Sequence, residues 1–117
     1  MIKYLENKKV MISIDEVKRL KKKYPNKIPI LLEAKNITID RHKYLVDNYT
    51  RFADLLLVFR RRISDLKPTE SIYMFVGEDP TLVPLHKEVK EVFDNLNTCG
   101  FIKITIAREN TFGSWII

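Results

Sequence analysis

One apolar stripe with helical spacing constrains the fold of this chain more than any other feature. Its members recur every three or four residues, so they line a single face of a helix. Arginines at positions 60, 61 and 62 occupy the last turn, where positive charge favours the negative end of the helix dipole. A helix of this kind must bury its apolar face against a second layer of structure. The stripe consists of Phe52, Leu55, Leu56, Phe59 and Ile63.

The segments before this helix are patterned as strands. Residues 28–33 alternate with a period of two, which is typical of a strand, and Pro29 indicates an edge or the start of pairing. A short candidate at Tyr44–Val46 precedes the turn-like pair Asp47-Asn48. We therefore expect these two segments to form a hairpin.

Two later segments complete the predicted sheet. Ser71–Val76 is a continuous run of β-branched and aromatic residues, which predicts a central strand buried on both faces. Residues 101–107 alternate again, with Ile102, Ile104 and Ile106 on one side. These four strands are expected to form one mixed sheet packed on the long helix.

Two further helices are predicted at either end of the pattern. Ser13 and Glu16 resemble a capping box at the start of a helix that continues to about Lys23 and that Pro25 ends. Another stripe predicts a helix before the last strand; it comprises Leu85, Val89, Val92, Phe93 and Leu96. The order is helix, two strands, helix, strand, helix, strand. This order predicts the α+β class, with a ubiquitin-like β-grasp, a four-stranded mixed sheet and an N-terminal helical extension.

The charge of the chain is unevenly distributed. The formal net charge is +6, but residues 1–62 hold 16 basic and 7 acidic side chains, whereas residues 63–117 hold 5 and 8. A basic field of this kind favours acidic peptides, anionic lipid or nucleic acid. The basic cluster Lys18–Lys23 has only Tyr24 nearby as a stacking aromatic, so specific nucleic-acid binding is the weaker alternative.

Catalysis is not indicated by the reactive residues. The only conceivable thiol triad is Cys99, His86 and Asp94, and Cys99 follows a helix end without an activating context. The two histidines and one cysteine lack zinc spacing, and three isolated glycines cannot form a phosphate-binding loop. We therefore predict no catalytic residue, no metal and no cofactor. A single cysteine cannot form an internal disulfide, so we expect a reducing compartment.

A basic, apolar edge suggests a binding role instead. Arg41 and Lys43 flank the strand Tyr44-Leu45-Val46, where an extended peptide could add to the sheet while its acidic flank meets the two cations. A plain core strand with a basic approach is the alternative.

Several sequence blocks point to a known family. They are Lys22–Ile30, Asp40–Val46 and Glu109–Gly113, with Phe59–Ile63 and Ile72–Val76 between them. In this order they resemble the autophagy ubiquitin-like modifiers of the GABARAP type. The resemblance covers residues from about Glu16 to Gly113. It implies an N-terminal helical extension over residues 1–25, a β-grasp domain over residues 26–112 and a removable tail at residues 113–117.

The resemblance implies a modifier rather than an enzyme. A cysteine protease would cleave between Gly113 and Ser114, next to Phe112. Activating and conjugating enzymes would then join Gly113 to phosphatidylethanolamine. The monomeric protein would be cytoplasmic, and on the autophagosome membrane after lipidation. There it would recruit cargo receptors that bear W/F/Y-x-x-L/I/V motifs.

The resemblance also assigns two pockets for such a motif. The aromatic residue would enter a first pocket with Arg41 and Lys27 supplying charge around it; its walls would be Glu16, Leu20, Pro29, Lys43, Leu45 and Phe101. The aliphatic residue would enter a second pocket formed by Tyr44, Val46, Leu55 and Val58. An anchor spacing of three is expected to require both anchors on the same side of the peptide. Asp47 and Thr50 replace the family's usual proline and leucine, which predicts a shallower and more polar second pocket.

Three alternatives remain open at this level. The chain could be conjugated to a protein lysine instead of a lipid amine. It could also be a basic binding module without conjugation, in which case nothing depends on Gly113. Lastly, the apolar residues after Gly113 could pack as an extension of the final strand.

Overall fold

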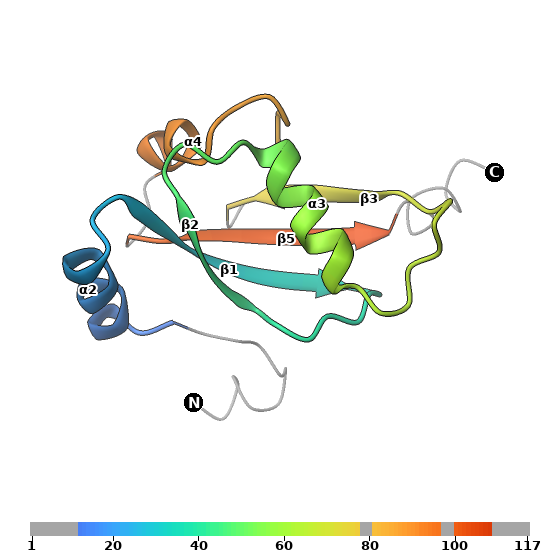
Figure 1. Ribbon diagram of the computed structural model, residues 1–117, viewed down its shortest axis with the longest axis horizontal. Helices are drawn as coiled ribbons and strands as arrows, with labels where there is room; N and C mark the ends of the chain where they lie inside the picture. Colours follow the sequence, from blue (N-terminus) through green and yellow to red (C-terminus); the bar gives the residue numbers. More distant parts are fainter. Residues whose placement is uncertain (1–11, 78–80, 97–99, 109–117) are drawn as a thin grey trace.

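A single mixed sheet with one helix across its face forms the centre of the structure. The computed structural model describes residues 12–77, 81–96 and 100–108. In Figure 1, helix α3 (Phe52–Arg62) crosses the sheet, whose strand order is β2-β1-β5-β3-β4. The remaining elements are α2 (Ile14–Lys23), β1 (Lys27–Lys35), β2 (Lys43–Asp47), β3 (Ile72–Val76), β4 (Thr81–Leu82), α4 (Val89–Asn95) and β5 (Ile102–Arg108).

The predicted hairpin is confirmed, because β1 and β2 pair antiparallel with Pro29 opposite Leu45. β1 also pairs with β5 in parallel, starting at Ile30 and Ile102. Pro29 therefore precedes the parallel ladder, where its missing N–H is not needed. Of the two alternatives that the sequence left for Pro29, the start of pairing is the correct one.

The central strand is β5, so the prediction that Ser71–Val76 is central was wrong. β3 lies one place further out, and its residues alternate between buried and half-buried instead of being buried on both faces. β5 has four consecutive buried residues, 104–107, and its neighbour β1 has five, 28–32, as expected for strands covered on two sides.

The sheet has five strands where the sequence predicted four. The additional strand, β4, pairs only Thr81 with Val76 and Leu82 with Phe75. Two residues are too few to show a period of two, so the sequence contained no signal for this edge strand.

The stripe on α3 faces the core as predicted. Phe52 and Phe59 are fully buried, Leu55 is 1% exposed and Ile63 closes the same cluster at the helix end. From the sheet, the cluster receives the alternate residues of three strands: Ile28, Ile30, Leu32, Ile72, Met74, Val76, Ile102, Ile104 and Ile106.

The last helix is shorter than its stripe predicted. α4 begins at Val89, whereas Leu85 lies in a turn before it and is 42% exposed. Lys87 N–H donates to Pro84 O within this turn, and Ala53 N–H at the start of α3 donates to Leu85 O. Residues 84–88 thus satisfy backbone groups at the first turn of α3, which a helix over the same residues could not do.

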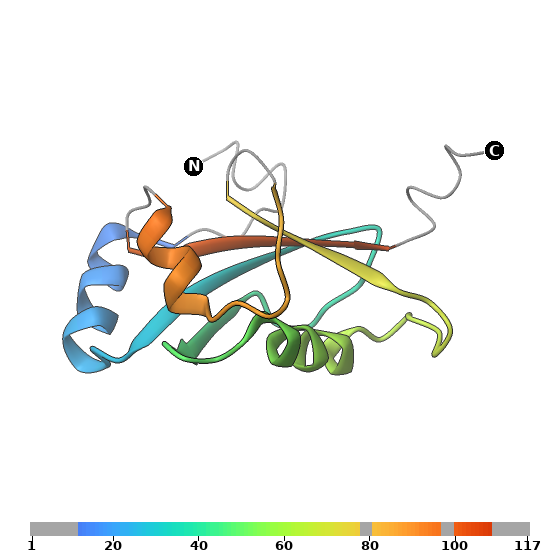
Figure 2. The same cartoon turned by 90° about the horizontal axis from the view of Figure 1, so that it is seen from above.

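Helix α2 lies beside the ends where β1 and β5 begin (Figures 1 and 2). Glu16 N–H donates to Ser13 Oγ at 3.1 Å, which confirms the predicted N-cap. The Glu16 carboxylate pairs with Lys43 Nζ on β2, also at 3.1 Å. Glu16, the second residue of the predicted capping box, thus links α2 to β2. None of the helices in the described residues is long and apolar enough to cross a membrane.

Gly100 sets how closely α2 can approach the sheet. Its φ is +95°, and an added Cβ would lie 2.5 Å from Val17 Cγ1. We expect Gly100→Ala to lower the free energy of unfolding by about 1–3 kcal/mol, as overpacking typically does. In a Val17→Ala background the same change should cost less, because the obstructing methyl is gone. Urea melts of the unmodified protein, the two single variants and the double variant measure the cost of Gly100→Ala in each background. Equal costs in the two backgrounds would contradict the contact between position 100 and Val17.

Candidate functional site

The free side of β2 is the candidate site, because β2 ends the sheet. It pairs with β1 on one side, and no described residue pairs with it on the other. β2 has five residues, whereas the opposite edge strand, β4, has two. An exposed edge of this length can accept an extended peptide as an additional strand.

The backbone of β2 presents free hydrogen-bonding groups to this edge. Leu32 N–H donates to His42 O, and Asn48 N–H donates to Asn26 O. In an antiparallel ladder such bonds fall on alternate residues, so Tyr44 and Val46 bond toward β1 and the residues between them point away. The N–H and C=O groups of Lys43 and Leu45 therefore face the open edge.

The side chains of β2 alternate between the two faces of the sheet. Tyr44 and Val46 pack against the core on the α3 side, so Lys43 and Leu45 lie on the other face. The two predicted pockets thus open on opposite faces of the same edge. Residues three apart in an extended peptide also point to opposite faces. The expectation that both anchors lie on the same side of the peptide does not hold for this edge.

The first predicted pocket lies on the face away from α3. Glu16 of α2 and Lys43 of β2 are joined across it by their ion pair. Pro29, directly opposite Leu45, is buried, and Leu45 is half-buried. Phe101 precedes Ile102, the partner of Ile30, so it lies level with Pro29 in the parallel register. Leu20, one turn after Glu16, is half-buried on α2.

The second predicted pocket lies between β2 and α3. The Tyr44 ring meets Phe59 edge-on, with centroids 5.1 Å apart and an interplanar angle of 65°. Val58 is 40% exposed and Val46 is half-buried, so both can be reached from outside. Leu55 is 1% exposed and belongs to the core. It therefore supports this pocket from beneath and does not form its accessible wall.

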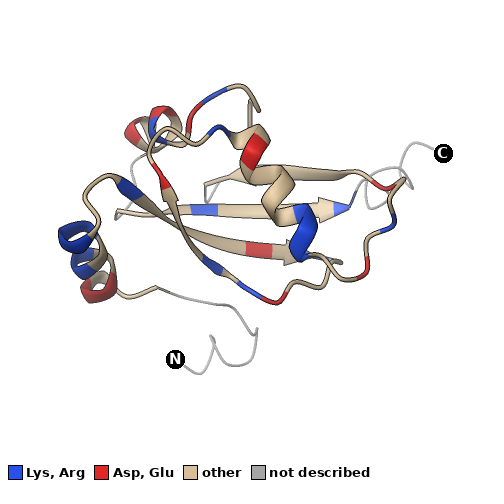
Figure 3. Ribbon diagram, in the orientation of Figure 1, with Lys and Arg blue, Asp and Glu red and all other residues tan. Residues whose placement is uncertain are grey.

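Charged residues gather near the hydroxyl end of Tyr44. Burial raises the pKa of Tyr44, an effect that Arg62 and Arg41 oppose and Asp40 strengthens. Arg62 Nη1 lies 3.5 Å from Asp40 Oδ2. Sequence reasoning treated Arg62 only as a helix-end cation, although it lies at this pocket. The basic turn at the end of α3 is visible in Figure 3.

Lys27 lies at the other end of the hairpin from Lys43. It pairs with Asp47 in the ladder, whereas Lys43 pairs with Leu31. Four residues along a strand correspond to about 13 Å. Lys27 and Pro29 are two residues apart on β1 and so share a face of the sheet, and both line a hollow near α4. Lys27 thus lies at the Pro29 end of the first predicted pocket, and Lys43 lies at its other end.

The chain end that would be conjugated follows β5, whose last residue is held firmly. Arg108 Nη2 donates to Asp65 O at 2.7 Å and lies 2.8 Å from Asp65 Oδ2. Glu70 lies 3.7 Å from the same guanidinium. A hydrogen bond from Thr38 N–H, with help from Arg108, lowers the pKa of Asp65. The predicted cleavage residues Phe112, Gly113 and Ser114 lie outside the described residues.

Potential metal ligands are scattered over the described part of the chain. It contains no group of three or more His, Cys, Asp or Glu side chains placed to hold a metal ion.

A helix across a mixed sheet, with a hairpin first and the last strand in the middle, defines a ubiquitin-like β-grasp protein. The fold is similar to that in "Crystal Structure of Trypanosoma brucei ATG8", with a TM-score of 0.67 and 21% identity over 82% of this chain and 84% of that chain. The family model described as "Autophagy protein Atg8 ubiquitin like" matches residues 13–113. The chain belongs to this Atg8 family.

Relatives from distant organisms agree with this assignment. "Autophagy-related protein 8e" of Arabidopsis thaliana is 35% identical over 104 residues, which cover 85% of this chain and 83% of that protein. "Autophagy-related protein 8" of Schizosaccharomyces pombe is 34% identical over 104 residues, which cover 85% of this chain and 84% of that protein. The resemblance drawn from sequence blocks is thereby confirmed at the level of the family.

Proposed function

We propose that this Atg8-family protein is trimmed after Gly113 and conjugated through that glycine to phosphatidylethanolamine on autophagosomal membranes. The observation that supports this most directly is that the family match extends through Gly113. The chain is the substrate in these steps, and a cysteine protease, an activating enzyme and a conjugating enzyme are the catalysts. It is cytoplasmic before conjugation.

The chemistry explains why a glycine suits this position. Without a side chain, Gly113 can extend through a narrow enzyme channel and present an unhindered carbonyl to a thiol or an amine. Transfer to phosphatidylethanolamine adds two acyl chains, which anchor stably where one is marginal. The intact mass of the protein purified from the membranes of its own cells tests both steps. A mass increase that matches a second protein, and not a phospholipid, would favour conjugation to a lysine.

The second part of the proposal is the capture of cargo receptors at the β2 edge. The peptide adds as a strand through Lys43 and Leu45, whose backbone groups face outward. Its aromatic residue enters beside Leu45 and Pro29, on the face away from α3. Its aliphatic residue, three positions later, enters beside Val58 on the α3 face. Acidic flanking residues meet Lys43 and Arg41.

This capture predicts a strong effect of Lys43→Glu combined with Leu45→Ala. The variant reverses one charge and removes one pocket wall, while the fold should persist because neither side chain belongs to the core. Losing a packed anchor costs ~2 kcal/mol or more, so we expect a Kd at least thirtyfold higher. Calorimetric titration with an aromatic-x-x-leucine peptide that carries upstream acidic residues measures this.

A matched control makes the same chemical changes elsewhere. Lys35→Glu with Leu57→Ala alters two exposed residues that are assigned to neither pocket, and Leu57 is 54% exposed. Its Kd should stay within twofold of the unmodified protein. Unchanged affinity in a folded Lys43→Glu, Leu45→Ala protein would mean that the peptide binds elsewhere.

A further inference from the structure

The strand pairing of β5 ends where the segment that leads to Gly113 begins. β5 pairs with β1 as far as Ala107, which lies opposite Lys35, and with β3 as far as Arg108, which lies opposite Ile72. Residues 109–113, here called the linker, connect this point to the glycine that would be conjugated. Chain ends generally fray unless other contacts hold them, so the end of β5 needs a hold besides its ladders.

The guanidinium of Arg108 supplies such a hold. Its Nη2 donates to Asp65 O at 2.7 Å and lies 2.8 Å from Asp65 Oδ2, and its Nη1 lies 3.7 Å from Glu70 Oε2. The side chain of Arg108 is only 19% exposed, so water and salt screen these contacts less than those of an open surface pair. Arg108, Asp65 and Glu70 thus form a clamp on the last residue of β5.

The two acids of the clamp are themselves fixed to the folded domain. Asp65 Oδ1 accepts from Thr38 N–H at 3.2 Å, in the loop after β1. Glu70 O accepts from Arg60 Nη1 at 2.8 Å, in the last turn of α3. Figure 1 shows the arrowhead of β5 beside the loop that leads from α3 to β3. The clamp therefore joins the end of β5 to two other parts of the fold.

The clamp limits where Gly113 can lie. Gly113 is five residues after Arg108, so even a fully extended linker keeps it within about 17 Å of Arg108. If the clamp opened and the last two residues of β5 separated, this limit would increase by about 7 Å. An enzyme that grips both the domain and the scissile bond must then order a longer free chain, which weakens the combined interaction.

We propose that Arg108 is a positioning residue for trimming: by clamping the end of β5, it fixes the origin of the linker and favours binding of the Gly113–Ser114 bond by the processing protease. This inference rests on the proposed function. Overall, hydrolysis breaks that peptide bond, and water supplies a hydroxyl to the Gly113 carbonyl and a hydrogen to the Ser114 amine. Arg108 takes no part in these bond changes, so its loss should act on KM and not on kcat.

The test compares trimming of full-length variants by the processing cysteine protease purified from the same cells, with intact mass as the readout. Arg108→Gln keeps most of the side-chain length but loses the charge and the forked donor group. Its KM should rise at least threefold, while kcat stays within twofold. All assays run well below the melting midpoint of every variant, so that each substrate is folded.

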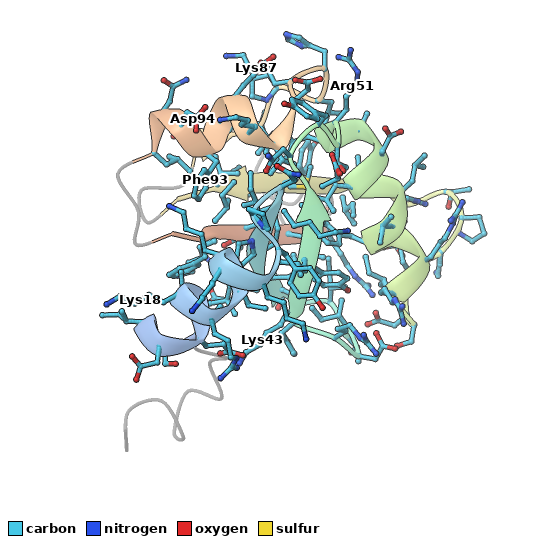
Figure 4. All side chains as sticks on the ribbon, turned by 60° about the vertical axis from the view of Figure 1, so that its left-hand side comes forward. Lys18, Lys43, Arg51, Lys87, Phe93 and Asp94 are labelled. Carbon is cyan, nitrogen blue, oxygen red and sulfur yellow. The ribbon has the colours of Figure 1, made fainter. Side chains whose placement is uncertain are left out.

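Arg51→Gln is the matched control. Arg51 Nη1 also donates to a backbone oxygen, that of His86, at 2.6 Å. Arg51 directly precedes α3, whereas Asp65 follows it, so this bond lies at the other end of the helix from the clamp. Arg51 is labelled near Lys87 in Figure 4. The control removes the same charge and the same kind of bond away from the linker, and its KM should stay within twofold of the unmodified chain.

An insertion separates positioning from stability. Adding Gly-Ser between Arg108 and Glu109 leaves the clamp residues unchanged but lengthens the linker by two residues. Its KM should also rise at least threefold. In the Arg108→Gln background the same insertion should raise KM by less than twofold further, because both changes act on the origin of the linker and are therefore not additive.

The outcomes distinguish this inference from the proposed function. Unchanged KM in Arg108→Gln, or a loss confined to kcat, would overturn the positioning role and leave trimming itself intact. An equal rise in KM for Arg51→Gln would mean that overall charge matters and not the clamp. An equal penalty from the insertion in both backgrounds would show that the clamp does not set the origin of the linker. If the unmodified chain is not cleaved after Gly113, the proposed function is wrong and this inference is wrong with it.

Discussion

A Gly113→Ala protein should remain full length and stay out of the membrane fraction. The added methyl group obstructs passage through the protease and hinders attack on the carbonyl, so neither trimming nor transfer to the lipid should proceed. The expected loss of the lipid-linked form is essentially complete. Intact-mass measurement of the soluble and membrane fractions should find Ile117 retained, in the soluble fraction only.

Two companion variants show whether Gly113→Ala blocks trimming or transfer to the lipid. Ile116→Ala changes a residue that trimming removes, so its mature mass should equal that of the unmodified protein. A chain that ends at Gly113 bypasses the protease and should still acquire the lipid. If a membrane-bound form of the unmodified protein retains Ile117, the proposed trimming and conjugation are both wrong.

Phe59→Ala should cause a large loss of stability. Phe59 is fully buried in the core and contacts the Tyr44 ring. Removing a buried phenyl ring typically costs 3–5 kcal/mol, from lost transfer free energy and the cavity left behind. Denaturant melts should therefore show a much lower midpoint at a similar slope.

Leu57→Ala is the matched control for this change, because Leu57 is on the same helix and 54% exposed. It should shift the free energy of unfolding by less than about 1 kcal/mol, since alanine favours helices. Arg51 is also exposed but is less suitable as a control, because its Nη1 donates to His86 O at 2.6 Å. Equal midpoints for the Phe59 and Leu57 variants would mean that the wrong face of α3 is assigned to the core.

Periodicity predicted the helices and the longer strands because each has one face buried in a single core. The stripe from Phe52 to Ile63 is a direct consequence of α3 crossing the sheet. The apolar pattern could not predict the order of the strands in the sheet. Ser71–Val76 looks more continuously apolar than β5, yet long-range pairing with β1 and β3 places β5 in the middle.

The candidate site was predicted through resemblance more than through pattern. Tyr44, Leu45 and Lys43 lie together on β2 as expected, but sequence could not show that the strand is open on one side. The position of Lys27 depends on the ladder register, and the role of Arg62 depends on α3 ending beside Asp40. Both facts arise from tertiary contacts between distant segments, which local spacing does not encode.

Asp47 has a structural explanation at a position where the family usually has proline. Its Oδ1 accepts from Tyr49 N–H at 3.0 Å, and its backbone O accepts from Thr50 N–H at 3.1 Å. The aspartate thus forms the turn that leads from β2 to α3, and a short polar side chain suits this role.

The position of β5 determines how a tethered molecule would carry mechanical load. The tail follows Arg108 at the end of β5, which is bonded to β1 on one side and to β3 on the other. A cargo held on β2 and a membrane holding the tail would pull from opposite sides of β1. The tension would run from β2 through β1 to β5, along ladders whose hydrogen bonds must break together when strands slide past one another. β4, with its two paired residues, and α4 lie off this line of force. The β4 edge, which has the fewest paired residues, would therefore carry little of the force while cargo is drawn toward the membrane.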